Sequence, residues 1–383
     1  MSDDFKPPQR VAGAEHGVVY RNEAEYCGWP FYCGLWRTEN GDIVAGFKRV
    51  RNDYAGADDV DHGQIAQKPA HLVTIRSADG GRNWSPASLQ TVFDMSWKKE
   101  EDFPEGKAAD WSGLPPLDFF SRDTLIMGGG VPSLFGQTAQ SWMRASTDGG
   151  KSWRAPIILP RYDLPSLTNF GSSMYATRED GVHLLSCQTN SPEALSPRPL
   201  VYGCMNGADW YFLSFMVEER PPTPFYVLES PYSPLPHFYP RIVVLPNGKV
   251  LASLRYQRDA RSVIWTEIYE SHDGGRTWGF LSRLNDIGAP GDLVPMRDGR
   301  VVCVYGYRTM PSGVRYKVSE DDGRSWGREI ILRDDGGSWD CGYPRVIEVE
   351  PGKLLTVYYI NRKDDPMQMN GGVRHIAWTM FRP

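Results

Sequence analysis

The stretch that decides the fold is Ser271-His272-Asp273-Gly274-Gly275-Arg276-Thr277-Trp278, which fits the pattern Ser-x-Asp-x-Gly-x-x-Trp. Three more copies begin at Ser77, Ser146 and Ser319 and end at Trp84, Trp153 and Trp326. Glycine tolerates the positive φ angles of tight turns, and Ser and Asp side chains hydrogen-bond to turn backbone. We therefore predict four structural turns, each pinned to a sheet by its tryptophan, and we assign these aspartates no catalytic role.

A second repeated element consists of an apolar run, a turn glycine and another apolar run, which predicts a β-hairpin. Its clear copies are centred on Gly41, Gly248, Gly299 and Gly352, and weaker copies lie near Asp123 and Gly181. A degenerate turn pattern ends the third unit at Gly207-Ala208-Asp209-Trp210. These repeats divide the chain into six units, each a small sheet of about four strands that is too exposed to stand alone.

The units predict an all-β fold, namely a six-bladed β-propeller of four-stranded antiparallel blades. The last unit ends near residues 375–381 without a fourth strand, whereas residues 17–20 have strand character before the first hairpin. We therefore expect the N-terminal strand to complete the last blade. A length of 383 residues exceeds the ~250–300 at which single cores usually stop growing, but one propeller over residues 1–383 accounts for it as a single domain.

Composition argues against several function classes. With 47 acidic and 42 basic residues, the net charge of −5 does not favour a nucleic-acid partner. No segment approaches the ~18 apolar residues of a membrane span, and residues 1–6 lack the apolar stretch of a secretory signal. The sequence as written predicts a cytoplasmic protein, or a periplasmic or secreted one if a signal was removed.

The six cysteines are scattered without metal-binding spacing, which predicts buried, reduced thiols and no metal site. The sequence has no phosphate-binding loop and no dinucleotide fingerprint, so we predict no cofactor.

The turn pattern and the six units resemble the Asp-box, or BNR, repeats of the sialidase (neuraminidase) superfamily over nearly the whole chain. The resemblance implies chemistry on the face opposite the Asp-boxes, at the starts of the innermost strands. It also implies a nucleophilic tyrosine, arginines that grip a substrate carboxylate, and an acid/base aspartate.

Two residues match the family by their distance from a hairpin glycine, and a third is a looser candidate. Tyr343 lies nine residues before Gly352, at the family spacing of the nucleophile. Arg255 lies seven residues after Gly248, where the family has a carboxylate-binding arginine, and Arg308 is a looser candidate for a second one.

In the first unit, Arg49 and the acidic loop 53–61 resemble the family segment that holds an arginine and then the acid/base aspartate. Asp59 and Asp61, beside His62, are the candidates because they lie late in this loop. The alternative interpretation is an ordinary solvated acidic loop.

Two positions depart from the family. Its first arginine would fall near Phe31, and the glutamate that activates its tyrosine would fall at Tyr239. The arginine clamp and the tyrosine–glutamate couple are both incomplete, which puts sialic acid itself in doubt as the substrate.

Tyr239-Pro240-Arg241 and Tyr343-Pro344-Arg345 have the same spacing to their turn glycines, and Asp292 occupies the corresponding place in the fifth unit. Because strand side chains alternate between faces, Tyr and Arg of each triplet share one face. Arg241, Arg345 and Asp292 either converge on the central funnel and bind substrate or tie neighbouring blades together.

Guanidinium groups grip carboxylates with two hydrogen bonds, so these arginines suit an acidic sugar. We predict a sialidase-like exo-acting glycoside hydrolase with a carbohydrate partner, Tyr343 as nucleophile and Asp61 or Asp59 as acid. A polysaccharide lyase, with Tyr343, Tyr239 or His62 as base, and a non-catalytic glycan-binding propeller are the alternatives. Tryptophans such as Trp111 and Trp339 either rim the pocket or pack within blades.

Overall fold

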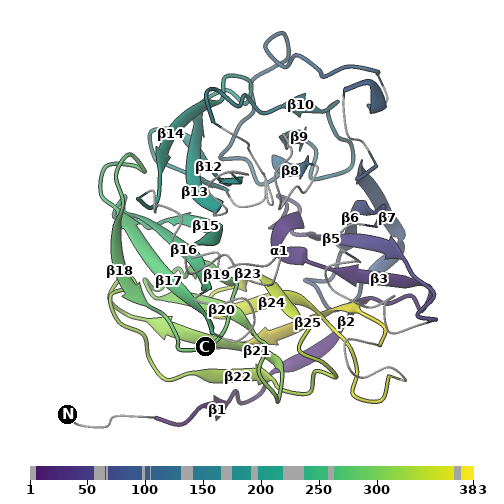
Figure 1. Cartoon of the computed structure of the whole chain (residues 1–383), viewed down its shortest axis with the longest axis vertical. Coiled ribbons are helices and arrows are strands. Elements are labelled where there is room, and N and C mark those ends of the chain that lie inside the picture. The colour runs from purple at the N-terminus through teal and green to yellow at the C-terminus, as the bar shows by residue number, and fades with distance from the viewer. Residues whose placement is uncertain are drawn as a thin grey trace, which may run out of the picture.

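Six antiparallel sheets are arranged around a central axis, so the chain forms a six-bladed β-propeller (Figure 1). The computed structural model describes residues 6–55, 65, 68–96, 100–103, 105–130, 141–164, 175–190, 197–218, 237–257, 263–365 and 372–383. This architecture confirms the all-β propeller that the repeats predict. No helix in these described ranges is long and apolar enough to cross a membrane.

Blades 1 to 3 come from the first half of the chain. Blade 1 contains β3 (Glu25–Gly28), β4 (Leu35–Arg37), β5 (Ile43–Arg51), β6 (His71–Ser77) and β7 (Ser85–Asp94). The one-turn helix α1 (Pro30–Cys33) joins β3 to β4, and both strands pair with β5. The described part of blade 2 contains β8 (Leu125–Gly130), β9 (Ser141–Ser146) and β10 (Ile157–Ile158). Blade 3 contains β11 (Tyr175–Thr177), β12 (His183–Asn190), β13 (Pro197–Cys204) and β14 (Tyr211–Phe215).

Blades 4 to 6 follow the same order from the axis outwards. Blade 4 contains β15 (Phe238–Val244), β16 (Val250–Gln257), β17 (Ile264–Ser271) and β18 (Gly279–Arg283). Blade 5 contains β19 (Gly291–Pro295), β20 (Val301–Tyr307), β21 (Gly313–Ser319) and β22 (Ile330–Arg333). Blade 6 contains β23 (Gly342–Glu350), β24 (Lys353–Ile360), β25 (His375–Phe381) and the N-terminal strand β2 (Glu15–Tyr20).

The N-terminal segment closes the ring, as predicted. Strand β2 pairs antiparallel with β25, with Gly17 opposite Trp378, and thereby supplies the outer strand of blade 6. The short strand β1 (Gln9–Arg10) adds a parallel edge to β22 of blade 5, which the sequence did not indicate. The chain therefore contributes strands to two neighbouring blades before it enters blade 1.

The Ser-x-Asp-x-Gly-x-x-Trp turns have the structural role that their sequence predicts. In the first copy, the Asp79 carboxylate accepts hydrogen bonds from the Ser77 hydroxyl at 2.7 Å and from the backbone N–H of Asn83 at 2.9 Å. The Trp84 indole donates to the carbonyl oxygen of Gly81 at 3.0 Å. The backbone hydrogen bond from Asn83 is the main cause that lowers the pKa of Asp79 to about 2. The carboxylate is thus occupied in shaping the turn.

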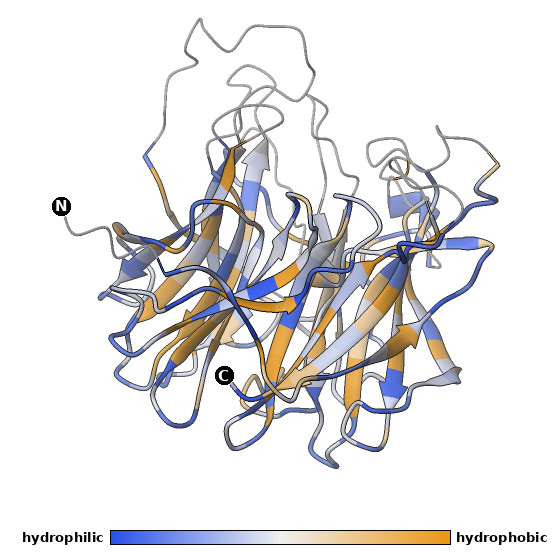
Figure 2. Cartoon of the chain, turned by 90° about the horizontal axis from the view of Figure 1, so that it is seen from below, coloured by the Kyte–Doolittle hydropathy of each residue, from blue (hydrophilic) through white to orange (hydrophobic). Residues whose placement is uncertain are grey.

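Both faces of a blade are covered by its neighbours, and the strands are accordingly apolar on both faces. In β20, Val302 and Val304 pack into a cluster with blade 6, whereas Val301 and Cys303 pack into a cluster with blade 4. Figure 2 shows the strands crossing from one face of the ring to the other, with apolar residues concentrated on them. All six cysteines are buried and none forms a disulfide.

Candidate active site

Three residues have a left-handed backbone and precede a proline: Trp29, which lies between β3 and α1, and Tyr239 and Tyr343, which lie at the starts of innermost strands. The φ angles are 55° at Trp29, 58° at Tyr239 and 48° at Tyr343. In blades 4 and 6 the strand register shifts at this point, between Phe238 and Arg241 and between Gly342 and Arg345. A left-handed non-glycine residue costs roughly 1–3 kcal/mol and persists where the surroundings fix it, often at functional sites. The repeated strain therefore marks this region near the axis as a functional candidate.

Three tyrosines, which we call the tyrosine cluster, meet in this region: Tyr32 of α1, Tyr239 of β15 and Tyr343 of β23. The ring centroids are 5.3 Å apart for Tyr32 and Tyr239, 5.4 Å for Tyr32 and Tyr343, and 5.7 Å for Tyr239 and Tyr343. The hydroxyl groups of Tyr32 and Tyr239 hydrogen-bond to that of Tyr343. Phe31 stands edge-on to the Tyr343 ring at 6.3 Å, in the region where the family resemblance places an arginine.

Two arginines flank Tyr343, and both are candidates from the sequence whose role in binding substrate stays a prediction. Arg255 in β16 donates from Nη1 to the Tyr343 hydroxyl at 3.3 Å and from Nη2 to Gln257 at 2.8 Å. Arg308, which follows β20, lies 4.8 Å from the Tyr343 ring centroid and 5.2 Å from that of Trp339. Trp339 is 37% exposed. The arginines therefore bring two positive charges to one phenol.

The electrostatics single out Tyr343 within the tyrosine cluster. Burial opposes ionisation of Tyr343, but the charges of Arg308 and Arg255, together with the hydrogen bonds from Tyr239 and Tyr32, hold the pKa of Tyr343 below its ordinary value. Burial, together with the neighbouring hydroxyl groups, instead raises the pKa of Tyr32 and of Tyr239 above the ordinary value. When one hydroxyl of the cluster ionises, it is that of Tyr343.

A buried carboxylate, Asp340, fixes the surroundings of Arg308. It accepts hydrogen bonds from the hydroxyl groups of Tyr26, at 2.6 Å, and of Tyr359. Its oxygens lie 3.6 Å from Nη2 of Arg308 and 3.5 Å from Nη2 of the fully buried Arg374. Arg308 also donates from Nη2 to Tyr359 at 3.0 Å. Sequence spacing did not identify these contacts, because the partners come from blades 1, 5 and 6.

Arg241, Arg345 and Asp292 converge, and the geometry favours the blade tie. Asp292 is fully buried and accepts from Arg241 Nε at 2.6 Å, from Arg345 Nη1 at 2.9 Å and from the backbone N–H of Val346 at 2.7 Å. These groups join the innermost strands β15, β19 and β23 of three blades. The two arginines are only 8% and 3% exposed. A substrate-binding role for the three residues stays a prediction.

The remaining predicted residues lie elsewhere or outside the described structure. Arg49 pairs with Glu25 within blade 1, donating from Nε at 3.0 Å, and lies over the ring of Tyr20. None of its described contacts is with the tyrosine cluster. Asp59, Asp61 and His62 lie outside the described residues, so the identity of the acid stays a prediction.

Two further side chains, Tyr32 and Tyr359, complete the site, and no clear pattern in the sequence pointed to them. Tyr32 follows Phe31 directly, but α1 interrupts the strand and removes the spacing that located Tyr239 and Tyr343. Tyr359 lies near the end of β24, in an apolar run that reads as core. No group of three or more His, Cys, Asp and Glu side chains in the described ranges could hold a metal ion.

The fold and the site together define a sialidase-like propeller, with tyrosine and arginine side chains meeting at the starts of inner strands. The family model of the BNR repeat-like domain matches residues 125–356, and the chain belongs to this family. No curated protein matches the chain.

Several solved structures share this fold at low sequence identity. A Dyadobacter fermentans protein of unknown function is 23% identical with a TM-score of 0.70, and the match covers 97% of this chain and 99% of that one. A Hadza microbial sialidase is 16% identical with a TM-score of 0.59, over 96% of this chain and 68% of that one. A Penicillium chrysogenum α-L-arabinanase complexed with arabinobiose is 12% identical with a TM-score of 0.60, over 98% and 99%. At these identities the likeness shows the fold alone.

Proposed function

We propose that the chain is an exo-acting glycoside hydrolase that cleaves a terminal acidic sugar from a glycan, with Tyr343 as the nucleophile. The observation that carries this proposal is a phenol placed between two guanidinium groups, with its pKa lowered by them. The similar solved propellers include a sialidase and an arabinanase, which supports glycan processing.

The surroundings of Tyr343 account for a nucleophile that works without the glutamate of the sialidase pattern. A neutral phenol is a weak nucleophile and is activated by a base or by a lowered pKa. Here Tyr239 occupies the glutamate position, and its hydroxyl, with that of Tyr32, hydrogen-bonds to Tyr343. Two positive charges and these hydrogen bonds favour the phenolate, so a carboxylate base at position 239 is not required.

The reaction follows the retaining course with a tyrosine nucleophile. The Tyr343 phenolate oxygen attacks the anomeric carbon while the glycosidic C–O bond breaks, and the leaving oxygen takes a proton from the acid, for which Asp59 and Asp61 are the candidates. Water then attacks the same carbon, gives its proton to that carboxylate and releases the sugar, which restores the phenolate.

The arginines favour an acidic substrate. Among the described residues, the buried Nε of Arg255 has no hydrogen-bond partner. Leaving a buried donor unpaired costs roughly 1–3 kcal/mol, so the site gains when an acceptor arrives. A sugar carboxylate is such an acceptor, and its charge also complements Arg255 and Arg308.

The test is hydrolysis of 4-methylumbelliferyl glycosides of sialic acid and of glucuronic acid by the wild-type protein and by Tyr343→Phe. We expect the substitution to lower kcat by about 1,000-fold or more, as loss of a nucleophile does. Tyr211→Phe is the matched control, because Tyr211 is an exposed tyrosine on blade 3. Mass spectrometry after acid quenching should find the sugar attached to Tyr343.

Three outcomes would contradict the proposal. Full activity of Tyr343→Phe would exclude Tyr343 as the nucleophile. An unsaturated product that absorbs in the ultraviolet from a uronate polymer would indicate a lyase that uses Tyr343 as a base. Binding of acidic glycans without turnover of any substrate would indicate a non-catalytic propeller.

A further inference from the structure

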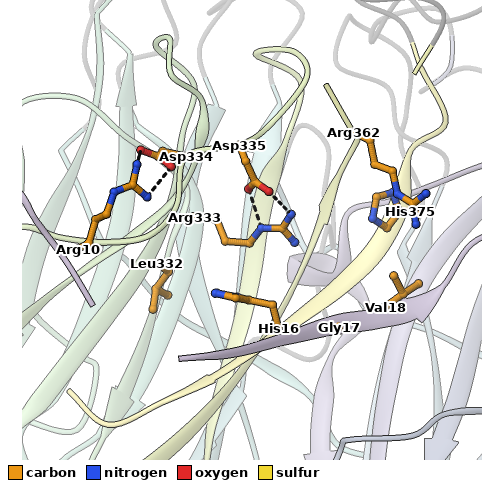
Figure 3. A pocket seen from close by; sticks show the side chains of 10 residues that line it. All are labelled: Arg10, His16, Gly17, Val18, Leu332, Arg333, Asp334, Asp335, Arg362 and His375. Atoms are coloured by element: carbon orange, nitrogen blue, oxygen red, sulfur yellow. Dashed lines mark hydrogen bonds and ion pairs between the residues drawn. The ribbon is translucent and has the colours of Figure 1, made fainter. Parts of the chain in front are cut away.

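A groove of about 440 Å³ lies between the outer strands of blades 5 and 6 (Figure 3). His16 and Val18 of β2 and His375 of β25 line one side, and Leu332 and Arg333 of β22 line the other. Alternate residues of β25 pack on opposite faces of blade 6: one set packs with blade 5, and the other packs with blade 1 in the apolar cluster that also contains Tyr343. The sheet of blade 6 therefore separates the groove from the tyrosine cluster.

Two arginine–aspartate pairs stand along the groove. Arg333 donates from Nε and Nη2 to the two oxygens of Asp335, both at 2.7 Å. Arg10 of β1 donates from Nη1 to Asp334 at 2.8 Å. The carboxylate of Asp335 is 54% exposed and keeps lone pairs for another donor. Each pair thus presents N–H donors and carboxylate acceptors next to each other.

The two histidines add uncharged polar groups. Burial lowers the pKa of His375 to about 4 and, with the charge of Arg333, lowers that of His16. Nδ1 of His16 lies 2.8 Å from the Thr379 hydroxyl oxygen, which fixes the ring. A neutral imidazole carries one donor and one acceptor nitrogen, which is what a sugar hydroxyl needs from a partner.

Arg362 gives the groove an excess positive charge. Its side chain is exposed and has no ion pair among the described residues, and it stands beside His375 (Figure 3). The lining contains three arginines and two aspartates. Val18, which is 41% exposed, and Leu332 supply an apolar surface.

We propose that this groove is a second carbohydrate-binding site, which takes an acidic sugar unit independently of Tyr343. The hydroxyl groups bond to the aspartates and histidines, the C–H face of the ring lies on Val18 and Leu332, and the carboxylate pairs with Arg362. A small inorganic anion would be repelled by the negative charges of Asp334 and Asp335. An apolar ligand would displace water from these carboxylates without replacing the hydrogen bonds that the water makes. A polyhydroxylated monoanion satisfies both the charge and the hydrogen bonds.

The experiment uses the full chain with ¹³C-labelled histidine and follows the Cε1–H resonances of His16 and His375 by NMR. The probes are trigalacturonate and 3′-sialyllactose, with maltotriose and lactose as neutral counterparts. We expect an acidic probe to move both resonances with a single Kd, and Arg362→Gln to weaken this binding about tenfold or more. Val18→Phe, which fills the apolar side, should weaken it as well.

Two controls separate this site from the candidate active site. Arg122→Gln removes another exposed arginine without an ion pair among the described residues, on blade 2, and should leave the Kd unchanged. Tyr343→Phe should abolish hydrolysis and leave the histidine shifts unchanged. The proposal is overturned if neither acidic probe moves the two resonances, if neutral sugars bind equally well, or if Arg362→Gln has no effect.

Discussion

The buried carboxylate of Asp292 offers the sharpest test of how the blades are held together. Asp292→Asn keeps the shape of the side chain and removes its charge. Arg241 and Arg345 then lie buried near each other without the anion that now accepts from both, at 2.6 Å and 2.9 Å. The substitution therefore isolates the electrostatic contribution of one residue to a three-blade contact.

The expected loss follows from the burial of all three groups. Removing one partner of a buried ion pair costs about 3–5 kcal/mol, because the remaining charge is left uncompensated. The unfolding entropy of a chain of 383 residues is about 0.8 kcal/mol per kelvin near 60 °C. The melting temperature should therefore fall by about 4–6 °C.

Differential scanning calorimetry at neutral pH measures this change, with Asp298→Asn as the matched control. Asp298 bonds to Arg300 on the surface at 2.7 Å, and such a pair contributes at most about 1 kcal/mol. A melting temperature of Asp292→Asn within about 1 °C of the wild-type value would refute the idea that the buried tie stabilises the ring.

Three further predictions concern charge and backbone geometry. The turn aspartates have pKa values lowered to about 2, so their contribution to stability is present above about pH 4 and is lost as the pH falls towards 2. In the wild-type protein the melting temperature should therefore fall between about pH 4 and pH 2, and replacing all four aspartates by Asn should make this fall smaller. They are Asp79, Asp148, Asp273 and Asp321. Arg308→Gln removes a charge that lowers the pKa of Tyr343, so the acidic limb of the kcat/KM profile should move to higher pH, and an unmoved limb would contradict a phenolate nucleophile. Gly342 has a φ of 96°, and Gly342→Ala would place a Cβ 2.6 Å from Cα of Gly306, whereas Gly41 has a similar φ of 89° but no neighbouring atom within 4 Å of its Cβ position. In urea unfolding, Gly342→Ala should therefore lower the free energy of unfolding more than Gly41→Ala does, by more than the roughly 1–3 kcal/mol that the backbone angle alone costs.

The fold could be predicted because its signals are local. Each turn pattern contains all the groups that form its hydrogen bonds, as Ser77, Asp79 and Trp84 show. The hairpin glycines fix the strand register over a few residues, so counting from Gly248 and Gly352 could align Arg255 and Tyr343 with the positions that the family resemblance implies. The unpaired end of blade 6 likewise predicted that an N-terminal strand would complete it.

The rest of the candidate site depends on contacts between distant parts of the chain. The role of Asp340 follows from its contacts with Tyr26 and Arg308, and no spacing rule in the sequence connects these residues to Asp340. The sequence could place Arg241, Arg345 and Asp292 together but could not choose between a substrate clamp and a blade tie, since the same side chains serve both. That choice required the burial and the distances of the folded chain.

The closing strand also sets an order of events during synthesis. His16 and Thr379, which lie next to each other in blade 6, are 363 residues apart in the chain. A ribosome adds about 5–20 residues per second, so β2 waits about 20–75 seconds for β25 to emerge. During that time β2 is a strand without its partner, and blade 6 is assembled only after β25 has been made. A chain that stops before β25 therefore leaves β2 and β24 without the strand that lies between them, and the ring cannot close.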